Sequence, residues 1–116
     1  MSEFDTATFI SKVWGSELCI SNNELYCLKL LSLYPGFQSS RHFHVRKDET
    51  FYVERGWCWL EVGDAKFKIT RGDAVRLAPG TIHRFSNTSP VVCKIIEVST
   101  HHSDEDVHRL EESRAI

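Results

Sequence analysis

The sequence lacks the features that would place it in a membrane or on nucleic acid. It has no run of 18 apolar residues, so it predicts no membrane span. Its formal net charge is −2, from 14 basic and 16 acidic side chains, which predicts no nucleic-acid binding. The first residues show neither the basic nor the apolar segment of a secretory signal. We therefore expect a cytoplasmic protein.

Pairs of cysteines at metal-binding spacing are also missing. The four cysteines, Cys19, Cys27, Cys58 and Cys93, form no C-x-x-C pair, which argues against a thiolate zinc site or a thioredoxin-type motif. Cys27, Cys58 and Cys93 lie within strand-like runs, and we expect them to be reduced and buried.

Short runs of β-forming residues, separated by turn signals, fill the chain from about residue 17 to residue 100. Without helical runs between them, they predict an all-β sandwich or barrel. The length of 116 residues predicts one domain, residues 1–116. Residues 3–13 suit either a short helix with Ser2 as its N-cap or an edge strand. Positive φ is expected at the glycines that end strands, namely Gly36, Gly56, Gly72 and Gly80.

Three histidines and one glutamate are spaced as in a metal site. His42 and His44 are two residues apart, so on a strand both side chains point to one face, about 6.6 Å apart. Glu49 follows a short polar turn, and His83 follows Gly80. Three neutral imidazoles and one carboxylate suit one divalent transition metal, Mn, Fe, Co, Ni or Zn. Four protein ligands on a six-coordinate ion would leave positions open for a substrate.

These residues carry a two-part motif that resembles the signature of the cupin superfamily. Its first part, G-x5-H-x-H-x4-E-x6-G, is matched by Gly36, His42, His44, Glu49 and Gly56. Its second part, G-x5-P-x-G-x2-H-x3-N, is matched by Gly72, Gly80, His83 and Asn87, with Ala78 in the place of proline. The resemblance implies a single-domain cupin jelly-roll barrel with its core at about residues 17–100. It also implies a metal held on the inner wall by His42, His44, Glu49 and His83.

The flanking segments resemble the cupin domain of type II mannose-6-phosphate isomerases, although those tend to carry glutamine where this chain has His42. This resemblance implies a sugar or sugar-phosphate isomerase or epimerase that acts through a metal-stabilised enediolate. Such a reaction needs a general base. Lys29 and Glu97 are candidate catalytic residues, because charged residues inside apolar β runs could face a polar interior. Alternatively, Lys29 points outward and Glu97 forms a structural ion pair with Arg84 or Arg109.

Other interpretations stay open at this point. The same ligands would serve an Fe(II)- or Ni(II)-dependent dioxygenase, or a metal-anchored module that binds a sugar without turnover. A phosphate on the substrate would need cations at the barrel mouth; Arg41, Lys47, Arg76 and Arg84 are available, or are plain surface charges. His101 and His102 are interpreted as surface residues, with a substrate contact as the alternative. We expect a small-molecule substrate and a homodimer in which the N-terminal segment could cover an edge strand.

Overall fold

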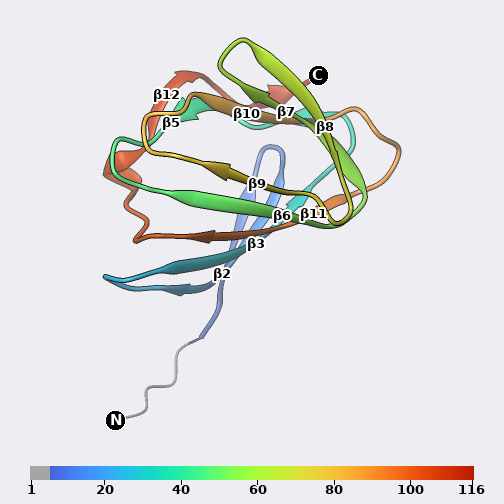
Figure 1. Cartoon of the computed structure of the whole chain (residues 1–116). Helices are drawn as coiled ribbons and strands as arrows, with labels where there is room; N and C mark the ends of the chain where they lie inside the picture. The colour runs from blue at the N-terminus through green and yellow to red at the C-terminus, as the bar shows by residue number, and fades with distance from the viewer. Residues whose placement is uncertain (1–5) are drawn as a thin grey trace.

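The computed structural model describes residues 6–116, which form two β-sheets that face each other (Figure 1). In spatial order, the first sheet contains β1 (Thr8–Lys12), β2 (Gly15–Asn22), β3 (Cys27–Leu33), β11 (Cys93–Ser99), β6 (Glu49–Arg55) and β9 (Ala74–Leu77). The second contains β12 (His108–Glu111), β5 (Arg41–Phe43), β10 (His83–Asn87), β4 (Phe37–Gln38) and β13 (Arg114–Ala115). It continues through β7 (Trp57–Val62), which pairs with β10 and with β8 (Ala65–Thr70). The all-β barrel expected from the sequence is confirmed.

The core lies between the sheets because inward and outward side chains alternate along each strand. In β3, Lys29 and Leu31 are buried while Leu30 between them is exposed. The buried apolar cluster comprises Leu31, Leu33, Phe51, Val53, Cys58, Leu60, Ile69, Leu77, Phe85, Cys93 and Ile95. Its members come from both sheets and close one end of the barrel interior. The other end of the interior, called the polar end below, is left to polar side chains.

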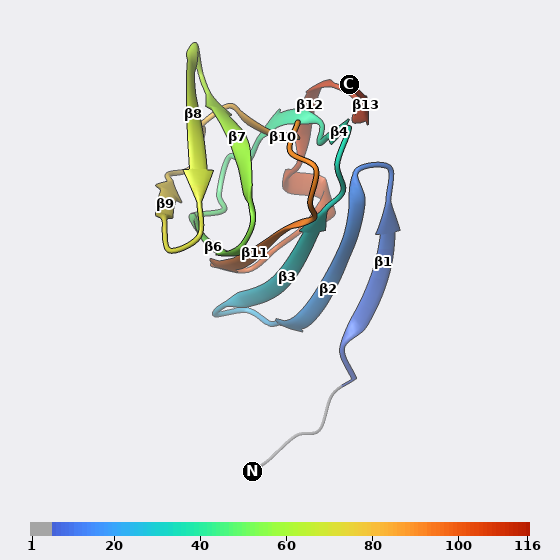
Figure 2. The ribbon, with the colours of Figure 1, turned by 90° about the vertical axis from the view of Figure 1, so that its right-hand side faces the viewer.

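The N-terminal segment adds a strand to the first sheet. β1 pairs antiparallel with β2 (Figure 2), and in the register of this hairpin Phe9 is the partner of Leu18. The strand alternative is therefore confirmed for residues 8–12, and the helix is wrong there. The side chains of this segment alternate with a period of two, which suits pairing with the sheet. Ser2, the expected N-cap, lies outside the described residues.

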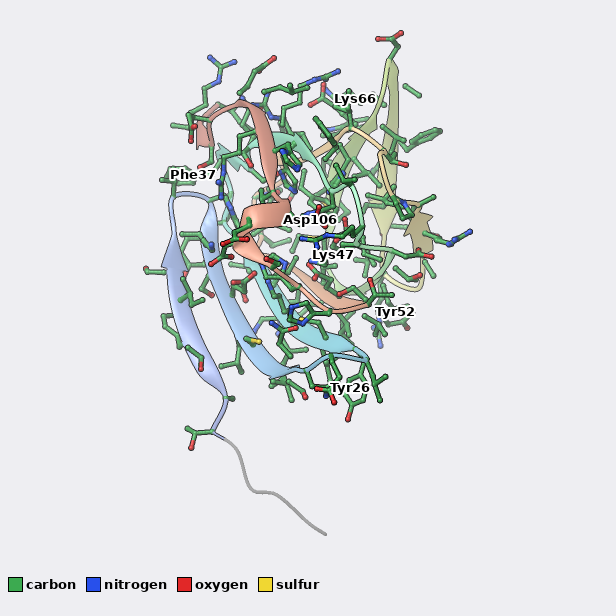
Figure 3. All side chains as sticks on the ribbon, turned by 90° about the vertical axis from the view of Figure 1, so that its left-hand side faces the viewer. Tyr26, Phe37, Lys47, Tyr52, Lys66 and Asp106 are labelled. Atoms are coloured by element: carbon green, nitrogen blue, oxygen red, sulfur yellow. The ribbon has the colours of Figure 1, made fainter. Side chains whose placement is uncertain are left out.

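Further strands come after residue 100, where the range expected for the barrel core ends. A 3-10 turn, η1 (Asp104–Asp106), leads into β12, which pairs with β5, and β13 pairs with β4. Figure 3 shows Lys47 and Asp106 toward the middle of the molecule and Tyr26 at its periphery. Hydrogen bonds from the backbone N–H groups of residues 45–47 to Asp106 place the turn η1 at the polar end of the barrel. Within residues 6–116, no helix is long and apolar enough to cross a membrane.

The expected positive φ angles are confirmed at the strand-ending glycines, with values of 87° at Gly36, 78° at Gly56, 93° at Gly72 and 84° at Gly80. Gly56 also has a steric reason. A Cβ atom there would lie 2.7 Å from the backbone oxygen of Val92, so a larger residue would push apart two neighbouring segments. The turn that starts β7 thus depends on the absence of a side chain.

Candidate metal centre

The three histidines of the motif meet at the polar end of the barrel. His42 in β5 lies opposite His83 in β10 in the antiparallel register, and His44 follows β5 directly. One ring nitrogen from each histidine lies within 4.8 Å of those from the other two. His44 and His83 are buried and His42 is half-buried. Two adjacent strands therefore bring together side chains that are about forty residues apart in the sequence.

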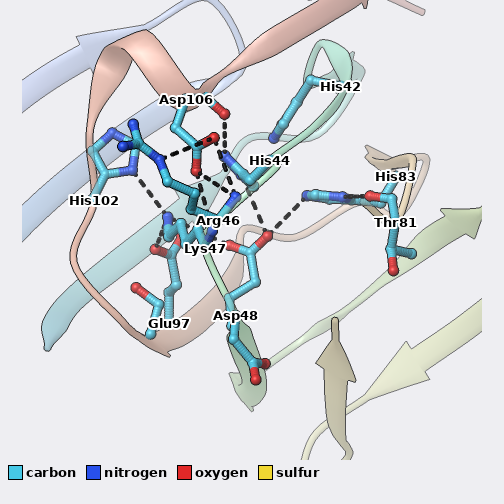
Figure 4. A network of polar contacts seen from close by, with 12 residues as sticks. His42, His44, Arg46, Lys47, Asp48, Thr81, His83, Glu97, His102 and Asp106 are labelled. Carbon is cyan, nitrogen blue, oxygen red and sulfur yellow. Dashed lines mark hydrogen bonds and ion pairs between the residues drawn. The ribbon is translucent and has the colours of Figure 1, made fainter. Parts of the chain in front are cut away.

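Backbone carbonyls fix the orientation of all three rings. The Nδ1 atom of His42 lies 3.0 Å from the carbonyl oxygen of Ser40, that of His83 lies 2.9 Å from Thr81, and that of His44 lies 3.2 Å from Asp106. A carbonyl can only accept, so each Nδ1 carries the proton and donates it. Each Nε2 is left with a free lone pair, which is how metal-binding histidines are held. Figure 4 shows the contact of His83 with Thr81.

Glu49, the first residue of β6, points its carboxylate at this cluster. Its Oε2 atom lies 3.4 Å from Nε2 of His44 and 3.3 Å from Nε2 of His83. With both rings protonated at Nδ1 and Glu49 ionised, these contacts join acceptors to an acceptor and are not hydrogen bonds. Among the buried side-chain oxygens and nitrogens of residues 6–116, Oε2 of Glu49 is the one without a hydrogen-bond partner. A cation between these atoms would satisfy all of them, so the donor set fits a divalent metal.

Burial sets the charge states of the same residues. It lowers the pKa of His42 and of His44 to about 3, and it lowers that of His83 as well. Neighbouring histidines and Lys47 add to the effect on His44. Burial, followed by the nearby Glu97, raises the pKa of Glu49 to about 7. The imidazoles are therefore neutral at pH 7, the form in which they ligate a metal.

Lys47, expected from the sequence to be either a cation for a substrate phosphate or a surface charge, is buried beside the cluster. Its Nζ atom lies 2.6 Å from Oε2 of Glu97, 3.4 Å from Oε1 of Glu49 and 3.1 Å from Nδ1 of His102 (Figure 4). Burial alone would lower the pKa of Lys47, but Glu97 and Glu49 raise it. Lys47 thus engages Oε1 of Glu49 and leaves Oε2 directed at the imidazoles.

The loop that carries Lys47 is held by a carboxylate from the other end of the chain. Asp106 accepts hydrogen bonds from the backbone N–H groups of Val45, Arg46 and Lys47, at 2.9 to 3.1 Å. On the other side, the N–H of Gly80 donates to the carbonyl oxygen of His44 at 2.6 Å. No sequence signal identified Asp106, because its partners are about sixty residues away.

Lys29 and Glu97 both face the interior. They lie opposite each other on β3 and β11, and both side chains are buried. Lys29 donates to Oε1 of Glu17 at 2.9 Å. The expectation of an inward position is confirmed for both, and the outward alternative for Lys29 is wrong. The ion pair of Glu97 with Arg84 or Arg109 is also wrong, since Glu97 pairs with Lys47.

The other cations suggested for a phosphate are engaged elsewhere. Arg84 is buried and donates to Oε2 of Glu111 at 2.9 Å and to the carbonyl of Ser39. Arg76 pairs with Asp48, and Arg41 donates to the carbonyl of Gly63 at 3.3 Å. The surface interpretation of His102 is wrong, because its half-buried ring lies between Lys47 and Asp104.

A cavity of about 480 Å³ opens onto the imidazoles. This volume lies within the usual range of small-molecule sites. Its wall combines apolar residues at the core end with the charged residues of the polar end, Glu17, Lys29, Lys47, Glu49 and Glu97. Such a cavity can enclose a small polar molecule next to the cluster. Cys19 also lines it, whereas Cys27, Cys58 and Cys93 are free, buried thiols as expected.

The comparisons with known proteins agree with this geometry. The sequence profile of the cupin domain matches residues 29–99, which include His42, His44, Glu49 and His83. A mannose-1-phosphate guanylyltransferase of Salmonella muenchen is 23% identical over 104 residues, or 88% of this chain and 22% of the relative. The chain spans about a quarter or less of the length of this relative, of the alginate biosynthesis protein AlgA of Pseudomonas aeruginosa and of a second mannose-1-phosphate guanylyltransferase, from Sinorhizobium fredii.

Solved structures share the fold at low identity. The capsular polysaccharide assembling protein CapF of Staphylococcus aureus has a TM-score of 0.80 at 17% identity, covering 91% of this chain and 34% of that one. A sugar phosphate isomerase of the cupin superfamily from Silicibacter pomeroyi has a TM-score of 0.69 at 22% identity, covering 87% and 74%. At these identities the likeness concerns the architecture alone.

Proposed function

Because the chain belongs to the cupin domain family, we propose that it is a metal-dependent isomerase or epimerase of a sugar or sugar phosphate. The observation that carries the proposal is the unpartnered Oε2 of Glu49 facing the imidazoles of His44 and His83 inside a polar cavity. The sugar-phosphate chemistry in the names of the guanylyltransferase relative and of the isomerase structure supports the choice of substrate.

His42, His44, Glu49 and His83 are the proposed metal ligands. Their neutral imidazoles and single carboxylate suit a divalent transition ion, Mn, Fe, Co, Ni or Zn. When bound, such an ion would supply Lewis-acid stabilisation of negative charge on substrate oxygens. The carbonyl partners of the three Nδ1 atoms keep the rings in place before binding. Little reorganisation would then be needed when the site fills.

Two ion pairs beside the cluster are the proposed catalytic groups. Isomerisation moves a proton between adjacent carbons through an enediolate of the sugar, and it needs a base at those carbons. Glu97 is the proposed base, with its carboxylate held by Lys47 at 2.6 Å. Lys29, held by Glu17 at 2.9 Å, is proposed to donate to a substrate hydroxyl. Both pairs line the cavity, which supports these roles.

Proton NMR of mannose 6-phosphate in heavy water tests this function. The protein is reconstituted with Mn, Co or Zn, and the metal is chelated before the spectrum is recorded. Metal-dependent loss of the C2 proton signal, or formation of fructose 6-phosphate, is the expected result. A Glu97→Gln variant should lose the exchange while keeping its metal. An unchanged spectrum with every metal would reject the assignment for this substrate. Oxygen uptake with Fe(II) across a substrate panel would instead favour a dioxygenase.

We also propose that the chain forms a homodimer through the outer face of the first sheet. On that face Phe9, Leu18, Leu30, Ile96 and Tyr52 are direct cross-strand neighbours, one from each of five adjacent strands. Phe9 is 65% exposed and Tyr52 42%. A continuous apolar row is self-complementary about a two-fold axis, because it can lie against its own copy. The N-terminal segment takes part in the proposed contact through β1, which extends this row.

Light scattering measures the oligomeric state directly. We expect twice the chain mass of 13.4 kDa, and we expect Leu30→Glu to give the single mass. Phe67→Glu, at an exposed position on β8, is the matched control and should stay dimeric. A wild-type mass of 13.4 kDa at micromolar concentration would reject the dimer.

A further inference from the structure

One cation of the cavity has no carboxylate partner. The cationic side chains on the cavity wall are Lys12, Lys29, Lys47 and Arg109. Lys29 and Lys47 are paired with Glu17 and Glu97, and Lys12 lies 4.0 Å from Glu17. Within residues 6–116, no carboxylate oxygen lies within 4.0 Å of the Arg109 guanidinium, so its charge is available to a ligand.

The sheet register directs Arg109 toward the imidazole cluster. Arg109 in β12 lies directly opposite His42 in β5, so the two side chains share one face of the sheet. The preceding residue, His108, points to the other face and stacks on Phe43 with ring centroids 5.0 Å apart. That stacking fixes the rotation of β12. Arg109 therefore stands at the mouth of the cavity, next to a proposed metal ligand, and stays exposed to solvent.

The charges deeper in the cavity have a different pattern. Glu17, Glu49 and Glu97 lie among the inner wall residues and are matched by Lys29 and Lys47. An anionic group placed there would meet carboxylates at short range and would lose its hydration, which is costly. Neutral hydroxyls suit this region, and an anion suits the mouth. The cavity thus separates a hydroxyl-binding interior from a cationic entrance.

We propose that Arg109 binds the anionic group, phosphate or carboxylate, of the sugar that occupies the cavity, and so makes the site selective for anionic over neutral sugars. The inference rests on the proposed function in that the ligand is a sugar next to the cluster. A guanidinium presents a planar fork of donors that matches either group with two parallel hydrogen bonds. Arg109 is then a specificity-determining residue, and the metal ligands and Glu97 keep their roles.

Calorimetric binding tests the inference without turnover. The zinc-loaded protein is titrated with mannose 6-phosphate, glucuronate and mannose at equal ionic strength. We expect at least one anionic sugar to bind about tenfold or more tighter than mannose, as for a charge-assisted hydrogen bond. Arg109→Gln should remove that difference and leave zinc content and mannose affinity unchanged, while Arg109→Lys should retain part of it. Arg71→Gln, an exposed arginine away from the cavity, is the matched control and should behave as wild type.

The outcomes separate this inference from the proposed isomerase. Discrimination that depends on Arg109, found without proton exchange in the NMR experiment, would support the anion site and reject isomerisation of mannose 6-phosphate. Equal affinity for the three sugars, unchanged discrimination in Arg109→Gln, or no binding of any of them would overturn the anion site, even if exchange occurs. The two anionic probes also show whether phosphate or carboxylate is preferred.

Discussion

At the scale of single residues, the polar end of the barrel gathers the Nε2 atoms of three imidazoles and the Oε2 atom of Glu49 around one point. The Nδ1 protons of His42, His44 and His83 are committed to backbone carbonyls. Oε1 of Glu49 faces Lys47, while Oε2 faces two nitrogen lone pairs. Buried polar atoms are rarely left in this state unless a ligand completes them. The arrangement is therefore best explained by a cation-binding role.

Removing one of these acceptors should remove the metal. Loss of an outer hydrogen-bond partner lowers metal affinity by roughly 10–100-fold. We expect His44→Ala and Glu49→Gln, which remove proposed ligands, to lower zinc affinity by more than that. Metal content after dialysis, measured by mass spectrometry, tests this. His101→Ala is the control, since its ring is exposed and contacts the carbonyl of Asn23 at 2.9 Å, away from the cluster. Equal zinc in all variants would contradict the ligand assignment.

The buried charge of Lys47 should matter for stability as well. Lys47→Met would leave Glu97 and Glu49 without their cation, and breaking a buried pair in this way costs about 3 kcal/mol or more. Arg76→Gln breaks the exposed pair with Asp48 and should have little measurable effect. Urea denaturation of the metal-free proteins measures both. A loss in Lys47→Met no larger than that in Arg76→Gln would mean that the network is not stabilising.

At the scale of elements, the site depends on a contact between two segments that are irregular in structure. The loop at residues 44–48 joins β5 to β6 and carries two of the site residues, and η1 lies against it. Asp106 joins them by accepting from three successive backbone N–H groups. Its own carbonyl oxygen accepts from His44. One residue of η1 therefore positions both the loop and a proposed ligand.

Asp106→Ala should loosen this loop. Three backbone donors would lose a buried acceptor, and a cost of about 2 kcal/mol or more is expected, together with weaker zinc binding. Glu105→Ala changes an exposed neighbour in η1 and should leave both properties intact. Hydrogen exchange at Val45, Arg46 and Lys47 gives the direct readout. Unchanged protection there in Asp106→Ala would show that the loop is held by other contacts.

At the scale of the whole molecule, metal binding should be coupled to folding. The proposed ligands come from β5, β6, β10 and the loop after β5, and they are brought together only in the folded chain. A metal at 100 times its dissociation constant should then stabilise the fold by about 2.7 kcal/mol. Thermal melting with and without zinc tests this, and EDTA should reverse the shift. His83→Ala should respond much less than wild type, and an equal response would place the bound zinc elsewhere.

The sequence by itself determined the class of fold and the proposed ligand set. The period of two in the β runs, the turn signals and the close spacing of His42 and His44 are local properties, and short-range sterics act on them directly. The same holds for the glycines, whose positive φ follows from the tight turns at strand ends. For this reason the all-β class followed from the pattern, whereas the meeting of the three imidazoles was what the cupin resemblance implied. His83 is distant in the sequence, and it entered the ligand set through the resemblance to the cupin signature.

Only the tertiary structure decided the partners of the charged residues. The pairing of Lys47 with Glu97, the anchoring by Asp106 and the free charge of Arg109 join residues from distant parts of the chain. The pattern of a charged residue within a loop does not distinguish a buried side chain from an exposed one. Burial and charge pairing depend on which strands become neighbours. Pairing between strands that are far apart in the sequence decides those neighbours, and it is complete only when the sheets close.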